Sequence, residues 1–130
     1  MLNNAHLTTI LPAVDLERAR RFYSQTLGLK EERKTAEGGV RFRAGDGTDL
    51  ELVPRGQPSK SEYTALTFEV SDVEGELRDL EGRGVKFEDY DLPGLKTERH
   101  IAVMGSEKAA WFKDPDGNIL CIHQGGGRRA

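Results

Sequence analysis

The sequence has only one cysteine, Cys121, among its 130 residues. One cysteine can form neither a disulfide within the chain nor a zinc cluster of several thiolates, so we expect a reducing, cytoplasmic location. The chain also lacks any apolar run near the roughly 20 residues that a membrane-spanning helix needs. Its first residues do not show the pattern of a signal peptide. These absences predict that the protein has no membrane partner.

An excess of basic residues is missing too. The 19 lysines and arginines and 22 acidic residues give a net charge of −3, and the two signs alternate along the chain. Nucleic-acid-binding domains of this size usually carry a basic patch, so we expect no nucleic-acid partner. Apolar residues make up 36% of the chain, which is enough for a core. The length predicts a single domain over residues 1–130.

What the chain does contain is a repeat. Asp15 and Asp72 lie 57 residues apart, and each sits between an alternating segment and a segment with helical spacing. The apolar residues with helical spacing are Leu16, Ala19, Tyr23 and Leu27 in the first copy and Val73, Leu77 and Leu80 in the second. We expect Asp15 to cap the first helix, and Ser71 with Glu74 to form a capping box for the second. Glycines end both helices, with Gly28 after the first and Gly82 and Gly84 after the second.

Strand-like segments surround both predicted helices. Clear polar–apolar alternation predicts strands at about 6–11, 49–53, 63–70 and 119–123, and weaker patterns predict strands at 30–35, 40–44, 85–90 and 108–112. Residues 91–107 are interpreted as a long loop with a strand near 101–104. Turn residues at 45–47 and 114–118 fit hairpins. The order strand–helix–strand–strand–strand therefore occurs twice, in modules at about 5–55 and 62–124.

One face of the main strands is apolar and suits packing against the two helices. The opposite face collects polar and reactive side chains, namely His6, Thr8, Asp49, Glu51, Tyr63, Thr67, Cys121 and His123. In a dry core, each unpaired polar group would cost about 1–3 kcal/mol. We therefore expect this face to be either an outer surface or, if the sheet curves with its helices outside, the lining of a wet cavity.

Two segments carry a family resemblance. The run from Asp15 to Tyr23, followed by Leu27-Gly28-Leu29, resembles the first helix of the vicinal oxygen chelate superfamily. The run from Phe112 to Asn118 resembles the turn before that superfamily's last strand. The superfamily includes glyoxalases, bleomycin-resistance proteins and extradiol dioxygenases. The resemblance covers essentially the whole chain and implies an α+β fold. In that fold, two βαβββ modules form an open curved barrel with helices outside, completed in a homodimer.

The resemblance also assigns four metal-ligand positions, which in this chain are Thr8, Glu51, Ala65 and Cys121. The family's usual residues there are His or Gln, Glu, His and Glu, so only Glu51 matches. We therefore expect no cofactor. The alternative is a divalent zinc, nickel, iron or manganese ion bound by His6, Glu51 and His123, a two-histidine, one-carboxylate set. Glu51 is the catalytic candidate in that case.

Three functions follow as hypotheses. The first is a small-molecule-binding protein of the glyoxalase/bleomycin-resistance type, with its ligand in the barrel cavity and no usual metal. The second is a lyase, isomerase or dioxygenase with a non-standard metal site, and the third is a non-catalytic accessory module. The predicted cavity residues are His6, Thr8, Asp49, Tyr63, Ala65, Thr67, Trp111, Cys121 and His123.

Three further features of the sequence are given no role in binding or catalysis. Cys121 and His123 lie on one strand face at a spacing that disfavours a nucleophile–base pair, and a lone cysteine is usually a small buried apolar residue. Arg41 and Arg43 could clamp an anion, but we interpret them as part of a solvated outer face. His100 is interpreted as a surface histidine in the long loop.

Overall fold

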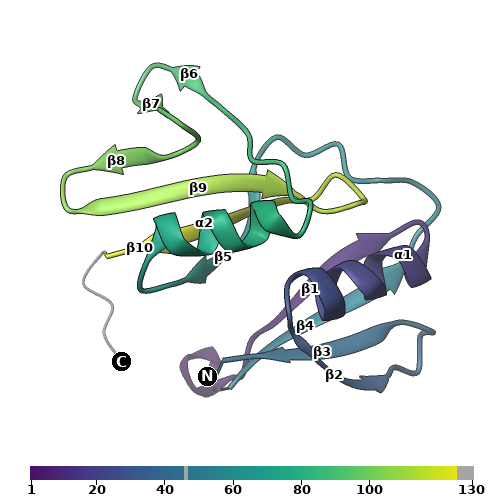
Figure 1. Cartoon of the computed structure of the whole chain (residues 1–130). Coiled ribbons are helices and arrows are strands. Elements are labelled where there is room, and N and C mark those ends of the chain that lie inside the picture. Colours follow the sequence, from purple (N-terminus) through teal and green to yellow (C-terminus); the bar gives the residue numbers. More distant parts are fainter. Residues whose placement is uncertain (46, 126–130) are drawn as a thin grey trace. The chain divides into compact units, whose positions relative to one another are not determined.

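The computed structural model describes residues 1–45 and 47–125 and divides into two compact units. Unit 1 contains Met1–Lys60 together with Pro115–Asn118, and unit 2 contains Ser61–Asp114 and the chain from Ile119 onward. Each unit has its own helix and its own four-stranded sheet (Figure 1). This arrangement confirms the predicted α+β fold class built from two modules. Asp46, in the predicted turn at 45–47, lies outside the described residues.

Unit 1 follows the predicted order of one strand, one helix and three strands. A short 3-10 helix, Leu2–Asn4, precedes these elements, which are β1 (Thr8–Ala13), α1 (Leu16–Arg21), a π-helical turn (Phe22–Thr26), β2 (Lys30–Lys34), β3 (Val40–Ala44) and β4 (Thr48–Pro54). The strands lie in the order β1-β4-β3-β2, with β1 parallel to β4 and the other pairs antiparallel. The predicted first helix is therefore present at its full length, as an α-helix continued by a π-helical turn.

The core of unit 1 lies between α1 and one face of the sheet. Ala19 and Tyr23 are fully buried, and the Tyr23 ring packs 6.1 Å from the Phe42 ring on β3. The predicted cap is confirmed, because the Asp15 carboxylate accepts a hydrogen bond from the Arg18 N–H at 3.1 Å. Gly28 follows the helix with φ of +80°, a left-handed conformation that favours glycine.

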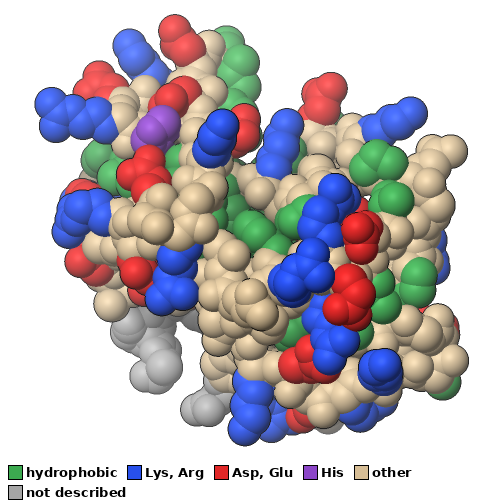
Figure 2. Space-filling model, turned by 45° about the vertical axis from the view of Figure 1, so that its right-hand side comes forward, with side chains coloured by type: hydrophobic (Ala, Val, Ile, Leu, Met, Phe, Trp, Pro, Cys, Tyr) green, Lys and Arg blue, Asp and Glu red, His purple; other side chains and the backbone are tan. Residues whose placement is uncertain are grey.

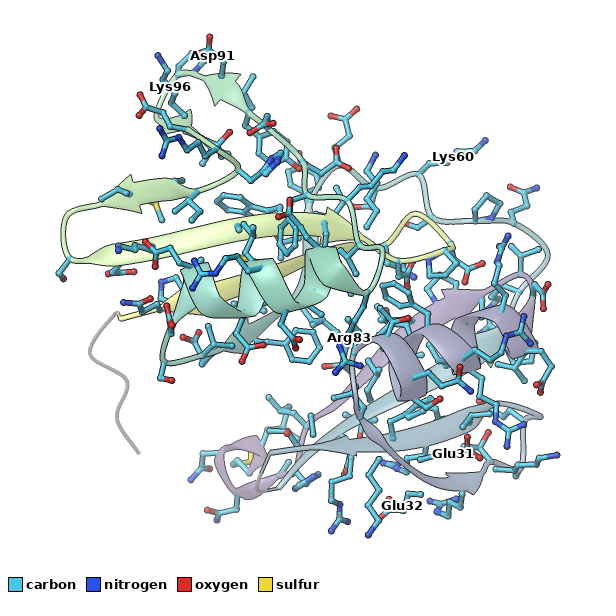
Figure 3. All side chains as sticks on the ribbon, in the orientation of Figure 1. Glu31, Glu32, Lys60, Arg83, Asp91 and Lys96 are labelled. Atoms are coloured by element: carbon cyan, nitrogen blue, oxygen red, sulfur yellow. The ribbon has the colours of Figure 1, made fainter. Side chains whose placement is uncertain are left out.

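Unit 2 repeats the plan with one addition. Its elements are β5 (Thr64–Glu69), α2 (Val73–Gly82), the small hairpin β6 (Asp91–Leu92) and β7 (Leu95–Lys96), then β8 (Ala102–Met104), β9 (Glu107–Lys113) and β10 (Ile119–Gln124). The sheet order is β5-β10-β9-β8, with β5 parallel to β10. Val73, Leu77 and Leu80 of α2 are buried, as their helical spacing predicts. Figure 3 marks Asp91 and Lys96, which lie opposite each other across the small hairpin.

Two predictions about unit 2 are wrong in detail. The cap of α2 is Asp72, which accepts a hydrogen bond from the Gly75 N–H, and not Ser71. Glu74 cannot complete a capping box, because its carboxylate pairs with Lys108 on β9 at 2.7 Å. Residues 85–90 form no strand, because β8 already pairs with the first part of β9 and leaves only a single bridge between Phe87 and Phe112.

The turn at Pro115–Asn118 belongs to unit 1, although the strands on either side belong to unit 2. Asp116 is 1% exposed, and its Oδ1 accepts a hydrogen bond from the Val14 N–H at 2.7 Å. Its backbone carbonyl accepts from the Ser59 N–H at 2.9 Å. Gly117 has φ of +81°, and a Cβ there would lie 3.0 Å from the Ser59 carbonyl oxygen. The sequence identifies the turn correctly, and Asp116 has a structural role in it.

The surface agrees with the interleaved charges of the sequence. Basic and acidic side chains alternate over the face drawn in Figure 2. Among the described residues, every helix falls short of the length and apolar character that a membrane span requires.

Candidate functional site

The face of the first sheet that points away from α1 carries the candidate site. Cross-strand register places Arg41 of β3 opposite Glu51 of β4, and Glu51 opposite Ile10 of β1. One step along, Arg43 lies opposite Asp49, which lies opposite Thr8. We call this surface the ligand face; its members are Thr8, Ile10, Pro12, Arg41, Arg43, Asp49, Glu51 and Val53.

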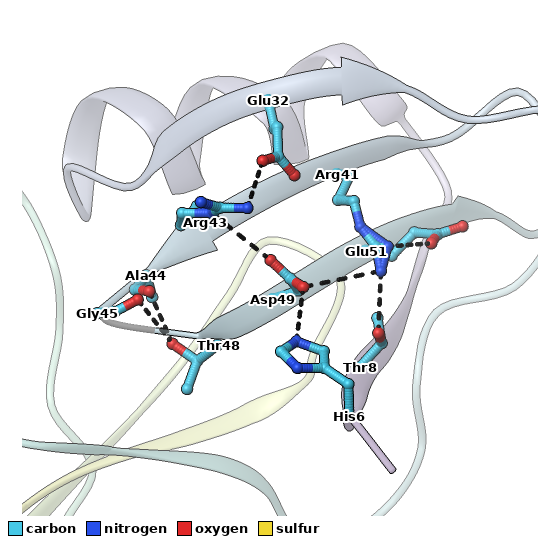
Figure 4. Close-up of polar contacts among 10 residues, drawn as sticks. All are labelled: His6, Thr8, Glu32, Arg41, Arg43, Ala44, Gly45, Thr48, Asp49 and Glu51. Atoms are coloured by element: carbon cyan, nitrogen blue, oxygen red, sulfur yellow. Dashed lines mark hydrogen bonds and ion pairs between the residues drawn. The ribbon is translucent and has the colours of Figure 1, made fainter.

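Arg41 occupies the centre of the ligand face (Figure 4). Its Nη2 donates a hydrogen bond to Oγ1 of Thr8 at 2.9 Å. The guanidinium also lies 3.8 Å from Oε1 of Glu51 and 3.9 Å from Oδ2 of Asp49. These three charged side chains are only 16%, 14% and 11% exposed, in that order, so solvent screens their charges weakly. The prediction that Arg41 lies on a solvated outer face is therefore wrong.

Further polar groups extend from Asp49 toward the edge of the sheet. Nε2 of His6 lies 3.0 Å from Oδ2 of Asp49, and Arg43 pairs with Glu32 at 2.6 Å (Figure 4). Oδ1 of Asp49 is buried and accepts no hydrogen bond within the described chain, although Nε of Arg43 lies 3.9 Å away. Such an acceptor would be satisfied by a ligand that brings an N–H or O–H group.

A hollow of about 450 Å³ lies at the apolar end of the ligand face. Its lining consists of Ile10, Pro12, Val53, Arg55, Gly56 and Gln57. The Arg55 N–H donates to the Ala13 carbonyl at 2.9 Å, which holds the start of the loop that lines the hollow. The volume falls within the range of small-molecule pockets.

Unit 2 has a corresponding face on its own sheet. Thr67 of β5, Cys121 of β10 and Trp111 of β9 are register partners and share this face. The Trp111 indole donates to Oγ1 of Thr64 at 3.2 Å and packs edge-on against Tyr90, with ring centroids 5.5 Å apart. Burial raises the pKa of the Cys121 thiol to about 11, and this effect outweighs the hydrogen bond that Thr67 provides. A thiol with that pKa is protonated at neutral pH, which disfavours a nucleophilic role.

His123 lies at the end of the same face, between two carboxylates. Its Nδ1 lies 2.7 Å from Glu69 of β5, and its Nε2 lies 2.7 Å from Glu107 of β9. These hydrogen bonds, first that of Glu69 and then that of Glu107, raise the pKa of His123 above its ordinary value. His123 is therefore tied to unit 2 by two charged partners.

The predicted site residues divide between the units. Unit 1 brings His6, Thr8, Asp49 and Glu51 together on the ligand face. On the second sheet lie Ala65, Thr67, Trp111, Cys121 and His123. The register between β5 and β10 skips Ala65, which is exposed, and Tyr63 precedes β5 and is 81% exposed. A common cavity formed by all of these residues stays a prediction.

The sequence analysis assigns Arg41 to the wrong environment and does not single out Tyr90, Glu107 or the loop at 55–57. A signal for Arg41 was available in the predicted turn at 45–47. A hairpin centred on residue 46 places position 41 opposite position 51, which is the register that the structure shows. The turn thus already implied that Arg41 faces Glu51. His100 lies in the loop before β8, with its side chain 32% exposed and its Nδ1 3.0 Å from Asp89.

The four positions that the resemblance assigns to a metal do not fit one here. Ala65 has no donor atom, and the neutral hydroxyl of Thr8 already accepts a hydrogen bond from Arg41. Glu51 and Cys121 remain, which is fewer than the three protein ligands that a catalytic site needs. Across residues 1–45 and 47–125, no group of three or more His, Cys, Asp or Glu side chains is placed to hold a metal ion. The alternative set of His6, Glu51 and His123 stays a prediction, since His123 belongs to the other unit.

Several solved structures share the fold. A member of the Glyoxalase/bleomycin resistance protein/dioxygenase superfamily from Sphaerobacter thermophilus aligns with a TM-score of 0.73 and 23% identity, covering 91% of this chain and 94% of that one. A lactoylglutathione lyase from Agrobacterium tumefaciens aligns with a TM-score of 0.70 and 22% identity, covering 97% and 98%. An antibiotic binding protein from a Streptomyces species aligns with a TM-score of 0.61 and 23% identity, covering 90% and 92%.

These identities are low, so the similarity to the three structures establishes the fold alone. No curated protein sequence matches the chain. The family model described as Glyoxalase/Bleomycin resistance protein/Dioxygenase superfamily matches residues 5–122, which is nearly the whole chain. The matched range includes both predicted signatures and every element from β1 to β9. The chain therefore belongs to the Glyoxalase/Bleomycin resistance protein/Dioxygenase superfamily.

Proposed function

We propose that the protein binds a small organic molecule on the ligand face of unit 1, without a metal ion at the family's usual position. The observation that carries the proposal is the continuity of this face. The hollow lined by Ile10 and Val53 lies next to Glu51 on β4, and Glu51 is the register partner of Arg41 on β3. A hollow with an apolar wall, here Ile10, Pro12 and Val53, beside a few oriented polar groups is the usual form of a small-molecule site.

The family comparison supports the same class of function. One structural neighbour is described as an antibiotic binding protein, and another as a lactoylglutathione lyase. Binding without chemistry fits this chain better, because Thr8, Ala65 and Cys121 do not supply the donors that a metal-dependent lyase needs. In this reading the protein sequesters its ligand and leaves it unchanged.

The test is a fragment titration followed by protein NMR, with a substitution inside the hollow. Ile10→Thr keeps a β-branched side chain on β1 but removes apolar surface from the lining, so fragments that shift signals of β1 and β4 should bind about threefold to tenfold more weakly. Leu92→Thr is the matched control. Leu92 is 55% exposed, as Ile10 is 53% exposed, but it belongs to β6 of unit 2 and is not a lining residue of the hollow. Equal affinities for the two variants would contradict the proposal.

We also propose that the protein acts as a cytoplasmic homodimer. Its single thiol, Cys121, is buried and suits a reducing compartment. Each sheet has unpaired edges within its own unit, among them β1 in the first and β5 in the second. Leu7, just before β1, is 84% exposed. Open edges with exposed apolar neighbours favour pairing with a second chain.

A further inference from the structure

We infer that the ligand presents a neutral group that both donates and accepts hydrogen bonds, a carboxamide or a hydroxyl, to Arg41 and Glu51. This inference rests on the proposed function and adds the chemical class of the ligand. It depends on three observations about the ligand face: which hydrogen bonds are unused, how the charges are placed, and how far the charges lie from the hollow.

Arg41 and Glu51 leave much of their hydrogen-bonding capacity unused. The only hydrogen bond of the Arg41 guanidinium within the described chain is the one to Thr8, although the group has five N–H donors. Its contact with Glu51 is 3.8 Å, which is too long for a hydrogen bond. Glu51 therefore has free acceptor atoms, and Arg41 has free donors, at the same place on the sheet.

The charges at this place oppose each other. A carboxylate ligand would be attracted by Arg41 but repelled by Glu51, and Asp49 lies 3.9 Å from the same guanidinium. An ammonium ligand would be attracted by Glu51 and Asp49 but repelled by Arg41 and by Arg43, whose Nε lies 3.9 Å from Oδ1 of Asp49. A neutral amide or hydroxyl meets neither repulsion, because it accepts from Arg41 and donates to Glu51 at once. The paired charges thus select against ions of both signs.

The strand geometry fixes the distance between the polar group and the apolar body. Glu51 and Val53 are two residues apart on β4 and lie on the same face, so their side chains are separated by about 7 Å. Val53 lines the hollow and Glu51 lies beside it. A ligand whose apolar ring fills the hollow can therefore reach Glu51 through a chain of a few atoms.

Three probes with one shared apolar body test the inference on the intact protein. They are 4-phenylbutanamide, 4-phenylbutanoate and 4-phenylbutylamine, titrated by calorimetry at neutral pH. We expect the amide to bind at least about tenfold more tightly than either ion. Tighter binding of the carboxylate or the amine would overturn the inference while leaving the proposed function intact. Failure of all three probes to bind would overturn both.

Two substitutions sharpen the result by shifting the ranking in opposite directions. Glu51→Gln removes the negative charge, so the carboxylate should gain affinity relative to the amide. Arg41→Met removes the positive charge, so the amine should gain instead. Arg21→Met is the matched control, because Arg21 is an exposed residue of α1, on the other side of the sheet, and it should leave the ranking unchanged. Opposite shifts cannot come from partial unfolding, and parallel shifts would overturn the inference. If a variant does not fold, the order of the three probe affinities in the unsubstituted protein still tests the inference.

Discussion

His123 shows how cross-strand neighbours control the charge of one side chain. A protonated imidazole donates from both ring nitrogens, so it satisfies Glu69 and Glu107 together. A neutral ring has one N–H and leaves one carboxylate without a donor. The folded protein therefore favours the protonated form, and this preference is the reason the pKa of His123 lies above its ordinary 6.5.

We expect folding stability to fall as the pH rises through the raised pKa of His123. Because the pKa is higher in the folded than in the unfolded state, the stabilisation is fully present below about pH 6.5 and is lost above the folded-state pKa. The loss should reach up to about 1 kcal/mol, since both glutamates are partly exposed. Urea unfolding of the native protein and of His123→Gln, at about pH 6 and about pH 9, measures it. An equal pH dependence in both proteins would contradict the assignment to His123.

At the scale of elements, sequence patterns predict the helices and strands whose formation depends on their own residues. Helical spacing predicts α1 and α2, and alternation predicts β1, β4, β5 and β10. The prediction of a strand at 85–90 is wrong, although apolar and polar residues alternate at its start. β8 pairs with β9 instead, and which of two segments pairs with a strand cannot be read from the local sequence. In the same way, the polar face could be predicted from alternation, whereas the central place of Arg41 required the register between β3 and β4.

The turn between Glu98 and Ile101 is an element that the sequence does not predict. Glu98 and Ile101 exchange backbone hydrogen bonds of 2.9 and 3.1 Å, and the two residues between them, Arg99 and His100, have φ of +53° and +76°. Two-residue turns with left-handed middle residues favour asparagine and glycine. Arginine and histidine are strained there, so side-chain contacts such as the pair of His100 with Asp89 must compensate.

Arg99→Asn should raise the free energy of unfolding by about 0.5–1 kcal/mol, because asparagine tolerates the left-handed conformation better than arginine does. Arg99→Ala is the matched control, since alanine removes the same side chain but keeps the strain. Denaturant unfolding of the two variants measures the difference between them. If the alanine variant proves as stable as the asparagine variant, the strain at this turn is not what limits stability.

At the scale of the whole molecule, the two units share a plan but not their side chains. The ligand face of unit 1 carries opposed charges and a hollow, while the matching face of unit 2 carries Trp111, a buried thiol and the His123 cluster. Neither face, taken alone, supplies the three protein ligands that a catalytic metal needs. The repeat thus supplies the framework, and the differences between its copies determine the chemistry.

Native mass spectrometry tests the metal and the assembly together. For protein prepared without a metal-binding tag or added metal, we expect a species of twice the 14.4 kDa chain mass, with well under one divalent ion per chain. Near-stoichiometric zinc, nickel, iron or manganese would contradict the metal prediction. If Glu51→Ala and His123→Ala each then removed that ion, the displaced metal site would become the better hypothesis. A species of single-chain mass at micromolar concentration would contradict the dimer.

The turn at Pro115–Asn118 has a consequence for synthesis on the ribosome. Unit 1 is complete only when Asp116 accepts the Val14 N–H and Asn118 donates to the Pro12 carbonyl. The rest of unit 1 ends at Lys60, so the nascent chain must grow by 58 residues before these bonds can form. At ordinary elongation rates that takes about 3–12 seconds. The segment Met1–Lys60 therefore emerges first and waits, with the end of β1 unsatisfied, for the turn at Pro115–Asn118.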